Sequence, residues 1–128
     1  MADKLSYLDF ATDEALYLID AYNLGLRFNA MVSQAQRICE CYMKHAITCS
    51  LMNNNEVMTS HNLRALYDYM ESLGLDLREI RSDIMLLNNF YTHTRYPGRD
   101  AFLASAEDIT SSVEAIQRIA KYMVRFFQ

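Results

Sequence analysis

The sequence predicts an all-α protein, built as an up-and-down four-helix bundle with an additional short helix. Apolar residues recur at three- and four-residue spacing almost throughout, which is the period of a helix rather than of a strand. Glycine and proline are scarce, with three and one in 128 residues, and they fall between the helical stretches. We therefore expect five helices in a single domain that covers residues 1–128.

The first two predicted helices are separated by Gly25. The first runs from about Ser6 to Leu24, with an apolar stripe formed by Leu8, Ala11, Ala15, Leu18 and Tyr22. The second is long, from about Leu26 to Met52, and three asparagines end it. Its stripe contains Phe28, Met31, Ala35, Ile38, Tyr42, Ala46 and Cys49. This regular three-four alternation is typical of the seam of an antiparallel bundle.

Capping residues and glycine define the other three helices. Ser60 is a suitable N-cap for the third helix, which Gly74 ends, and Asp76 can begin the fourth. Ser105 through Asp108 is similar to a capping box and begins the last helix. The residues expected to face inward are Leu63, Leu66, Met70 and Leu73 in the third helix, Leu77, Ile80, Ile84 and Leu87 in the fourth, and Ile109, Val113, Ile116, Ala120, Met123 and Phe127 in the last.

Composition excludes several kinds of protein. With 52% hydrophobic residues the chain is not disordered, and a net charge of −4 gives no broad basic face for phosphate contacts. We therefore expect no DNA binding, and any nucleotide or RNA site must be local. The sequence shows no signal peptide and no apolar run of the ~20 residues that span a bilayer, so we expect a cytoplasmic protein without membrane contact. Cys39, Cys41 and Cys49 lack zinc-finger spacing, and we expect no metal and no cofactor.

The segment from Phe90 to Gly98 concentrates functional side chains before the only proline. It carries three aromatic residues, a histidine and an arginine. Pro97 restricts the residue before it to extended geometry, so the preceding helix must stop there. Loops of this composition on a rigid scaffold often carry function. The alternative is that the Pro-Gly pair only turns the chain while the tyrosines seal the end of the core.

Three blocks of residues in order carry a likeness to a known family. In the first, residues 28–44, Glu40 and Lys44 follow an E-x3-K pattern. The second, Ser60-His61-Asn62-Leu63, is similar to Thr-His-Asp-Leu and is followed by Leu73-Gly74-Leu75. The third, residues 91–98, is similar to Tyr-x3-Arg-Tyr-Pro-Asp. In these blocks the chain resembles the HEPN family, with Arg37, Asn62 and Gly98 as departures from its pattern.

This resemblance implies a helical bundle that usually forms a symmetric dimer, so we expect a homodimer. It also implies two activities. Many members accompany a small nucleotidyltransferase, often as a toxin–antitoxin pair, whereas others are metal-independent ribonucleases with an Arg-x(4–6)-His motif. Our first hypothesis is a non-catalytic nucleotide-binding and interaction module that works with a nucleotidyltransferase. Its predicted binding residues are Lys44, His61, Tyr91, Arg95 and Tyr96.

Each of these residues has a chemical reason and a structural alternative. His61 is expected in the first turn of the third helix, where backbone N–H groups favour anions. Arg95 can pair with a phosphate, Tyr91 or Tyr96 can stack on a base, and Lys44 can add positive charge. In the structural interpretation, Lys44 and Glu40 form an exposed i,i+4 pair worth only ~0.2–0.5 kcal/mol. His61 then packs or caps locally, and Arg95 pairs with Asp100 or a helix C-terminus.

The ribonuclease motif is not found in this chain, because no arginine precedes a histidine by the required spacing. Arg37 and His45 are the nearest such pair, and they are eight residues apart. Our second hypothesis is therefore a ribonuclease in which His93 and Arg95 meet across a dimer, with the histidine moving a proton and the arginine stabilising phosphate charge. A third is a purely structural bundle whose Tyr-His-Arg-Tyr loop locks the ends of helices.

Overall fold

The computed structural model describes residues 5–94 and 96–127, without the side chains of residues 91–93. Its described part contains helices and loops but no strand, which confirms the predicted all-α fold class. The elements are α1 (Tyr7–Asn23), α2 (Ala30–Cys49), α3 (Asn55–Met58), α4 (Leu63–Ser72), a 3-10 turn at Arg78–Ile80, α5 (Arg81–His93), α6 (Ala106–Met123) and a 3-10 turn at Val124–Phe126. The predicted helices correspond to α1, α2, α4, α5 and α6.

Helix α3 is the element that periodicity did not reveal, because it spans a single turn. The sequence predicts only that Asn53, Asn54 and Asn55 end the second helix. In the structure the Asn54 side chain accepts hydrogen bonds from the backbone N–H groups of Glu56 and Val57. This capping allows one turn of helix to form between α2 and α4.

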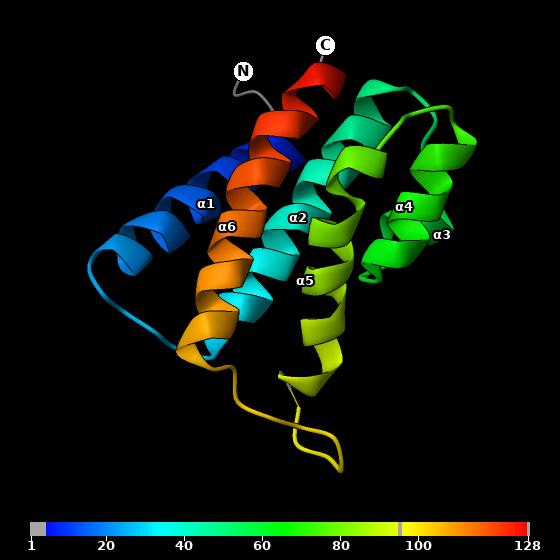
Figure 1. The fold of residues 1–128 in the computed structure, drawn as a ribbon. Helices are drawn as coiled ribbons and strands as arrows, with labels where there is room; N and C mark the ends of the chain where they lie inside the picture. Colours follow the sequence, from blue (N-terminus) through cyan, green and yellow to red (C-terminus); the bar gives the residue numbers. More distant parts are fainter. Residues whose placement is uncertain (1–4, 95, 128) are drawn as a thin grey trace.

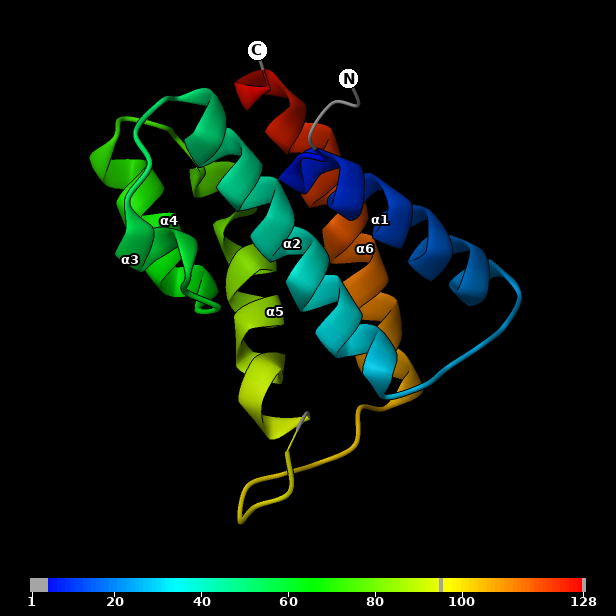
Figure 2. The same cartoon turned by 180° about the vertical axis from the view of Figure 1, so that it is seen from behind.

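Helix α2 is the centre of the bundle and packs against α1, α4, α5 and α6. Figures 1 and 2 show α2, α5 and α6 side by side, with α1 along one flank and the α3–α4 pair along the other. The loop between α5 and α6 lies at the opposite end of the bundle from the two termini (Figure 1). The layout therefore leaves α1 at one edge, the α3–α4 pair at the other edge and the α5–α6 loop at one end.

The predicted apolar stripes form most of the core. The fully buried large side chains are Leu18, Ile38, Met43, Ile47, Leu63, Leu66, Met70, Leu77, Ile84, Leu87, Ile109 and Ile116. All four inward residues predicted for the fourth helix are buried. Phe28 is the exception, since its side chain is exposed. Helix α2 begins only at Ala30, so Phe28 belongs to the preceding loop and does not extend the stripe.

The helix ends follow the sequence signals with one correction. Gly25 and Gly74 adopt φ of +90° and +84° just after α1 and α4, as expected of glycine after a helix. The capping box of Ser105 and Asp108 opens α6. The N-cap of α4, however, is Asn62 and not Ser60. Asn62 accepts from two backbone N–H groups of the first turn, whereas the Ser60 hydroxyl accepts from the N–H of Asn62 itself.

A single side chain fixes the α5–α6 loop to the start of α2. The Asn29 amide nitrogen donates to the carbonyl of Thr94 at 2.6 Å, and its oxygen accepts from the N–H of Ala104 at 2.7 Å. Both ends of the loop are therefore tied to the same residue. No described helix is both long enough and apolar enough to cross a bilayer.

Candidate functional site

Four polar residues meet between α2 and the segment that precedes α4. Gln36, Glu40 and Lys44 recur at four-residue spacing on α2, and all three are buried. The Lys44 ammonium donates to Glu40 Oε2 at 2.9 Å. His61 Nδ1 lies 3.1 and 3.2 Å from the two oxygens of the same carboxylate, and its carbonyl accepts from Gln36 Nε2 at 2.8 Å. We call Gln36, Glu40, Lys44 and His61 the polar cluster.

The ion pair of this cluster is inside the protein. The Glu40 and Lys44 side chains are only 10% and 4% exposed, so the prediction of an exposed i,i+4 pair is wrong. The error arises because sequence spacing shows that two residues share a helix face but not what covers that face. Both charges are removed from water, and each depends on the other to offset the loss of hydration. Gln36 adds a further cost of burial, because its buried Oε1 has no hydrogen-bond partner among the described residues.

The start of α4 does not offer the free N–H groups that the sequence analysis expected. His61 precedes the N-cap instead of lying in the first turn. The N–H of Leu63 donates to Asn88 Oδ1 at 2.9 Å, and those of Arg64 and Ala65 donate to the Asn62 side chain. Side chains thus satisfy these donors, so the expectation of free N–H groups beside His61 is wrong, whereas the role of His61 in binding stays a prediction.

The predicted binding residues fall in two places. Lys44 and His61 belong to the polar cluster, but the Lys44 ammonium is enclosed against Glu40 and would act through that carboxylate. The His61 side chain is 61% exposed at the mouth of the cluster. Glu40 therefore fixes the orientation of a ring that reaches the surface, as carboxylates do for histidines in many sites.

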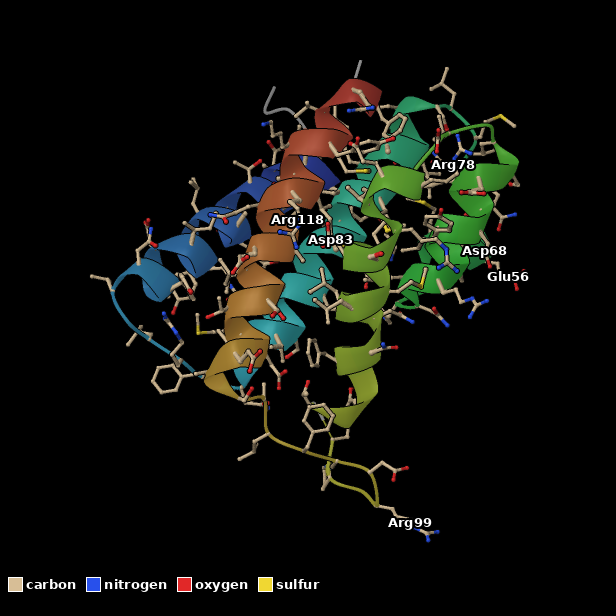
Figure 3. The ribbon with its side chains drawn as sticks, viewed as in Figure 1. Glu56, Asp68, Arg78, Asp83, Arg99 and Arg118 are labelled. Carbon is tan, nitrogen blue, oxygen red and sulfur yellow. The ribbon has the colours of Figure 1, made fainter. Side chains whose placement is uncertain are left out.

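Tyr96 lies in a second place, on the α5–α6 loop. Its side chain is exposed and lines a cleft of about 510 Å³ together with Asn29, Thr94, Pro97, Ala101, Phe102 and Leu103. The Phe102 ring packs edge-on against Phe90, with 6.2 Å between the ring centroids. An aromatic surface of this kind can accept a planar ring. Arg99 extends from the tip of the same loop (Figure 3).

Helix α5 connects the two places. Asn88 touches the start of α4, and Thr94 lies at the loop cleft. Six residues separate them, which is about 9 Å along a helix. Tyr91 and His93 belong to the last turns of α5, but their side chains lie outside the described residues, as does Arg95 as a whole. Their roles in binding or in cleavage stay predictions.

Arg37 and His45, the nearest approach to a ribonuclease motif, engage different parts of the protein. Arg37 forms an ion pair with Glu14 on α1. The His45 ring packs edge-on against Phe127 at 4.8 Å, and its Nε2 lies 3.5 Å from Cys49 Sγ. Burial lowers the pKa of His45, which favours the neutral imidazole. The arrangement is that of two packing residues, not of a paired acid and base.

The cysteines are free, and burial makes two of them poor nucleophiles. It raises the pKa of the Cys39 thiol strongly and that of Cys41 to about 11. Among the described residues, no three histidine, cysteine or carboxylate side chains gather in a way that could hold a metal ion.

Four residues of these sites were not predicted: Gln36, Asn29, Asn88 and Phe102. A signal existed for Gln36, because it precedes Glu40 by the same four residues that separate Glu40 from Lys44. A polar row along the central helix of a bundle is a pattern that sequence reasoning can recognise. Asn29 and Asn88 carried no such signal, since their hydrogen bonds join segments that are distant in the sequence.

The fold and the site together define a helical bundle with a buried charged cluster on its central helix. The family model of the HEPN domain matches residues 13–126, and the chain therefore belongs to the HEPN family. HEPN domains commonly dimerise and have nucleotide- or RNA-related functions. No curated protein and no solved structure gave a significant match.

Proposed function

We propose that this protein is a cytoplasmic, non-catalytic nucleotide-binding module. In this proposal the nucleotide lies along α5, between His61 and the cleft of Tyr96 and Phe102. The single observation that carries the proposal is the polar cluster. Glu40 and Lys44 are buried together, and the Glu40 carboxylate contacts the imidazole of His61 at the surface.

The energetics of the cluster favour a functional role. A buried ion pair rarely stabilises a fold more than apolar side chains of the same size would. The pair therefore contributes something other than stability, and its visible effect here is to orient His61. An imidazole fixed in this way can donate to a phosphate or read the edge of a base.

The second part of the site supplies a stacking surface. Tyr96 and Phe102 are both exposed on the α5–α6 loop, and the Asn29 side chain anchors that loop at both ends. Asn88 beside the start of α4 and Thr94 at the cleft are about 9 Å apart along α5, and in our proposal the ligand lies along this stretch with its base at the cleft and its phosphates towards His61. In our proposal Tyr91 stacks beside the base, and Arg95 pairs with the phosphate.

Titration of the purified protein with fluorescent ATP and GTP analogues tests this proposal. We expect saturable binding in fluorescence anisotropy, weakened at least tenfold, about 1.4 kcal/mol, by His61→Ala and by Arg95→Ala. Arg78→Ala is the matched control, because it removes an arginine whose ion pair with Asp76 is fully at the surface. Absence of nucleotide binding by the wild-type protein would contradict the proposal, as would equal binding by all variants.

We also propose that a small nucleotidyltransferase is the protein partner, as a toxin–antitoxin type pair. The support is the family membership and the family's association with such enzymes. Co-expression with a short nucleotidyltransferase encoded by a neighbouring gene tests this. A complex that stays together in size-exclusion chromatography supports the proposal, whereas separate elution of the two proteins at micromolar concentration contradicts it.

The same preparations test the ribonuclease hypothesis. We expect no cleavage of single-stranded RNA without added metal, either by the wild-type protein or by His93→Ala. Cleavage by the wild type that His93→Ala abolishes, with the fold intact, would replace the binding module with an enzyme. Cleavage that persists in His93→Ala would place the chemistry at another residue.

A further inference from the structure

Exposed apolar side chains gather at the N-terminal part of the described chain. Those between residues 5 and 28 are Leu5, Tyr7, Phe10, Leu16, Tyr17, Leu24, Leu26 and Phe28. Elsewhere in the described residues, the exposed large apolar side chains are spread over α2's end, the α5–α6 loop and the C-terminal turn. A concentration of exposed apolar side chains in one part of a protein commonly marks an interaction site.

Helix α1 arranges these side chains in a row. Phe10, Tyr17 and Leu24 follow one another at seven-residue spacing, which returns to nearly the same side of a helix. Leu16 flanks the row, and Tyr17 and Leu16 are 67% and 60% exposed. Ala11, Ala15, Leu18 and Ala21 are buried in the bundle, and they centre about 100° around the helix axis from the row. Figures 1 and 2 show α1 at the edge of the bundle, and the side chains of Phe10, Tyr17 and Leu24 are all exposed.

The same side of α1 is acidic. Asp9, Asp13 and Asp20 lie close to the apolar row, whereas Tyr7–Asn23 contains no lysine or arginine. Glu14 is a fourth acidic residue of the helix, and its charge is offset by Arg37. Among the described residues, Arg37–Glu14 is the ion pair that reaches α1. The outer side of α1 therefore combines an apolar row with uncompensated negative charge.

We propose that the outer side of α1 docks a basic amphipathic helix of a different protein. Apolar residues at heptad spacing on that helix would pack on Phe10, Tyr17 and Leu24, and its lysines or arginines would face Asp13 and Asp20. A second copy of α1 is the wrong occupant, because it would bring the same negative charges into contact. The inference names the docking surface for the protein partner and rests on that part of the proposed function.

Two synthetic peptides test the proposal directly. One is a fluorescent amphipathic helix of about 20 residues with leucine at heptad positions and lysine beside them, and the other replaces each lysine with glutamate. Anisotropy titrations should show the basic peptide binding the wild-type protein at least about tenfold tighter than the acidic one. Equal binding of the two peptides would overturn the proposal.

Variants locate the binding surface. Asp13→Lys together with Asp20→Lys should weaken binding of the basic peptide at least about tenfold, and so should Phe10→Ser together with Tyr17→Ser. The matched control is Glu56→Lys with Asp68→Lys, which changes the charge equally on the α3–α4 side of the molecule (Figure 3). An equal loss of binding in the control pair would show non-specific attraction and would overturn the proposal.

Two further measurements separate this inference from its alternatives. Sedimentation of wild type and of Phe10→Ser with Tyr17→Ser shows whether the surface joins two copies, and dissociation of a wild-type dimer by that change would contradict a foreign partner. Nucleotide titrations on the same variants should match the wild type. Loss of peptide binding with intact nucleotide binding would assign the effect to the surface of α1. Loss of nucleotide binding with intact peptide binding would contradict the proposed docking surface, because α1 would then serve nucleotide binding instead.

Discussion

Two ion pairs of this protein have similar contacts and very different surroundings. Lys44 and Glu40 meet at 2.9 Å inside the bundle, where both side chains are almost fully enclosed. Arg118 and Asp83 meet at 2.8 Å where α6 passes α5, and the arginine side chain is largely in solvent (Figure 3). The contact distance is the same within 0.1 Å, and the two carboxylates are almost equally enclosed, with Glu40 10% and Asp83 13% exposed. The pairs differ in their cations, because Lys44 is 4% exposed and Arg118 is 56% exposed.

The comparison shows that the solvent exposure of a charged side chain decides how much its ion-pair partner contributes to stability. A solvated arginine that loses its carboxylate is rehydrated by water, so the pair contributes little. A buried lysine or glutamate that loses its partner has no such compensation. The surface pair can therefore be removed with little effect, whereas the buried pair must be kept or replaced as a unit.

The largest expected effect comes from breaking the buried pair. Lys44→Met leaves the Glu40 carboxylate enclosed with only His61 beside it. We expect the free energy of unfolding to fall by about 3–5 kcal/mol. Urea denaturation followed by circular dichroism measures this change, and a loss no larger than that of Arg118→Ala would show that water reaches Glu40.

A smaller effect is expected at the helix cap beside the cluster. Asn62→Ala removes the acceptor for the N–H groups of Arg64 and Ala65 and should cost about 1 kcal/mol. Ser60→Ala is the control, because its hydroxyl accepts only from the loop N–H of Asn62. If Ser60→Ala proved the more destabilising of the two in urea, the cap would be the residue that the sequence first suggested.

The surface pair gives a smaller effect again. Arg118→Ala removes the guanidinium that contacts both oxygens of Asp83. Asp83 is only 13% exposed in the wild type, but truncation of the solvated Arg118 to alanine opens that carboxylate to water. We therefore expect a loss of about 0.2–1 kcal/mol at low ionic strength, with less in high salt because the pair is screened. The difference between the destabilisation by Lys44→Met and that by Arg118→Ala measures how much more a buried cation than a solvated one contributes to the free energy of unfolding. A cost above 3 kcal/mol for Arg118→Ala, on the order of a buried pair, would remove that distinction.

The smallest expected effect is a pH dependence at Asp76, which is fully exposed. Hydrogen bonds from the Arg78 side chain and backbone lower the pKa of Asp76 from 3.8 to about 2. A carboxyl whose pKa is depressed by folding stabilises the protein above its unfolded pKa, and this contribution is lost as pH falls through the folded value. The stability difference between wild type and Asp76→Asn should therefore shrink from pH 4 to pH 2. A constant difference over that range would contradict the assignment.

The fold was accessible from the sequence because it depends on patterns that repeat along each helix. Residues such as Ile84 and Leu87 lie on a periodic stripe, and Ser105 with Asp108 is a local capping signal. Even the breaks at Gly25 and Gly74 are local, because positive φ favours glycine.

The site was less accessible because it depends on what covers each helix. Glu40 and Lys44 were recognised as a pair, but only packing shows that His61 and its neighbours close over them. The cap of α4 moved from Ser60 to Asn62 for a related reason, since Asn88 of a distant helix satisfies the first N–H of the turn. Contacts between segments that are distant in the sequence cannot be predicted from the local sequence pattern of either segment.

The central claim is that the buried pair serves nucleotide binding through His61 and is not needed for the fold. The double variant Glu40→Gln with Lys44→Met tests it most directly, because it removes both charges at similar volume. We predict a free energy of unfolding within about 1 kcal/mol of the wild type, together with nucleotide binding at least tenfold weaker, about 1.4 kcal/mol. Unchanged nucleotide binding by a folded double variant would contradict the account.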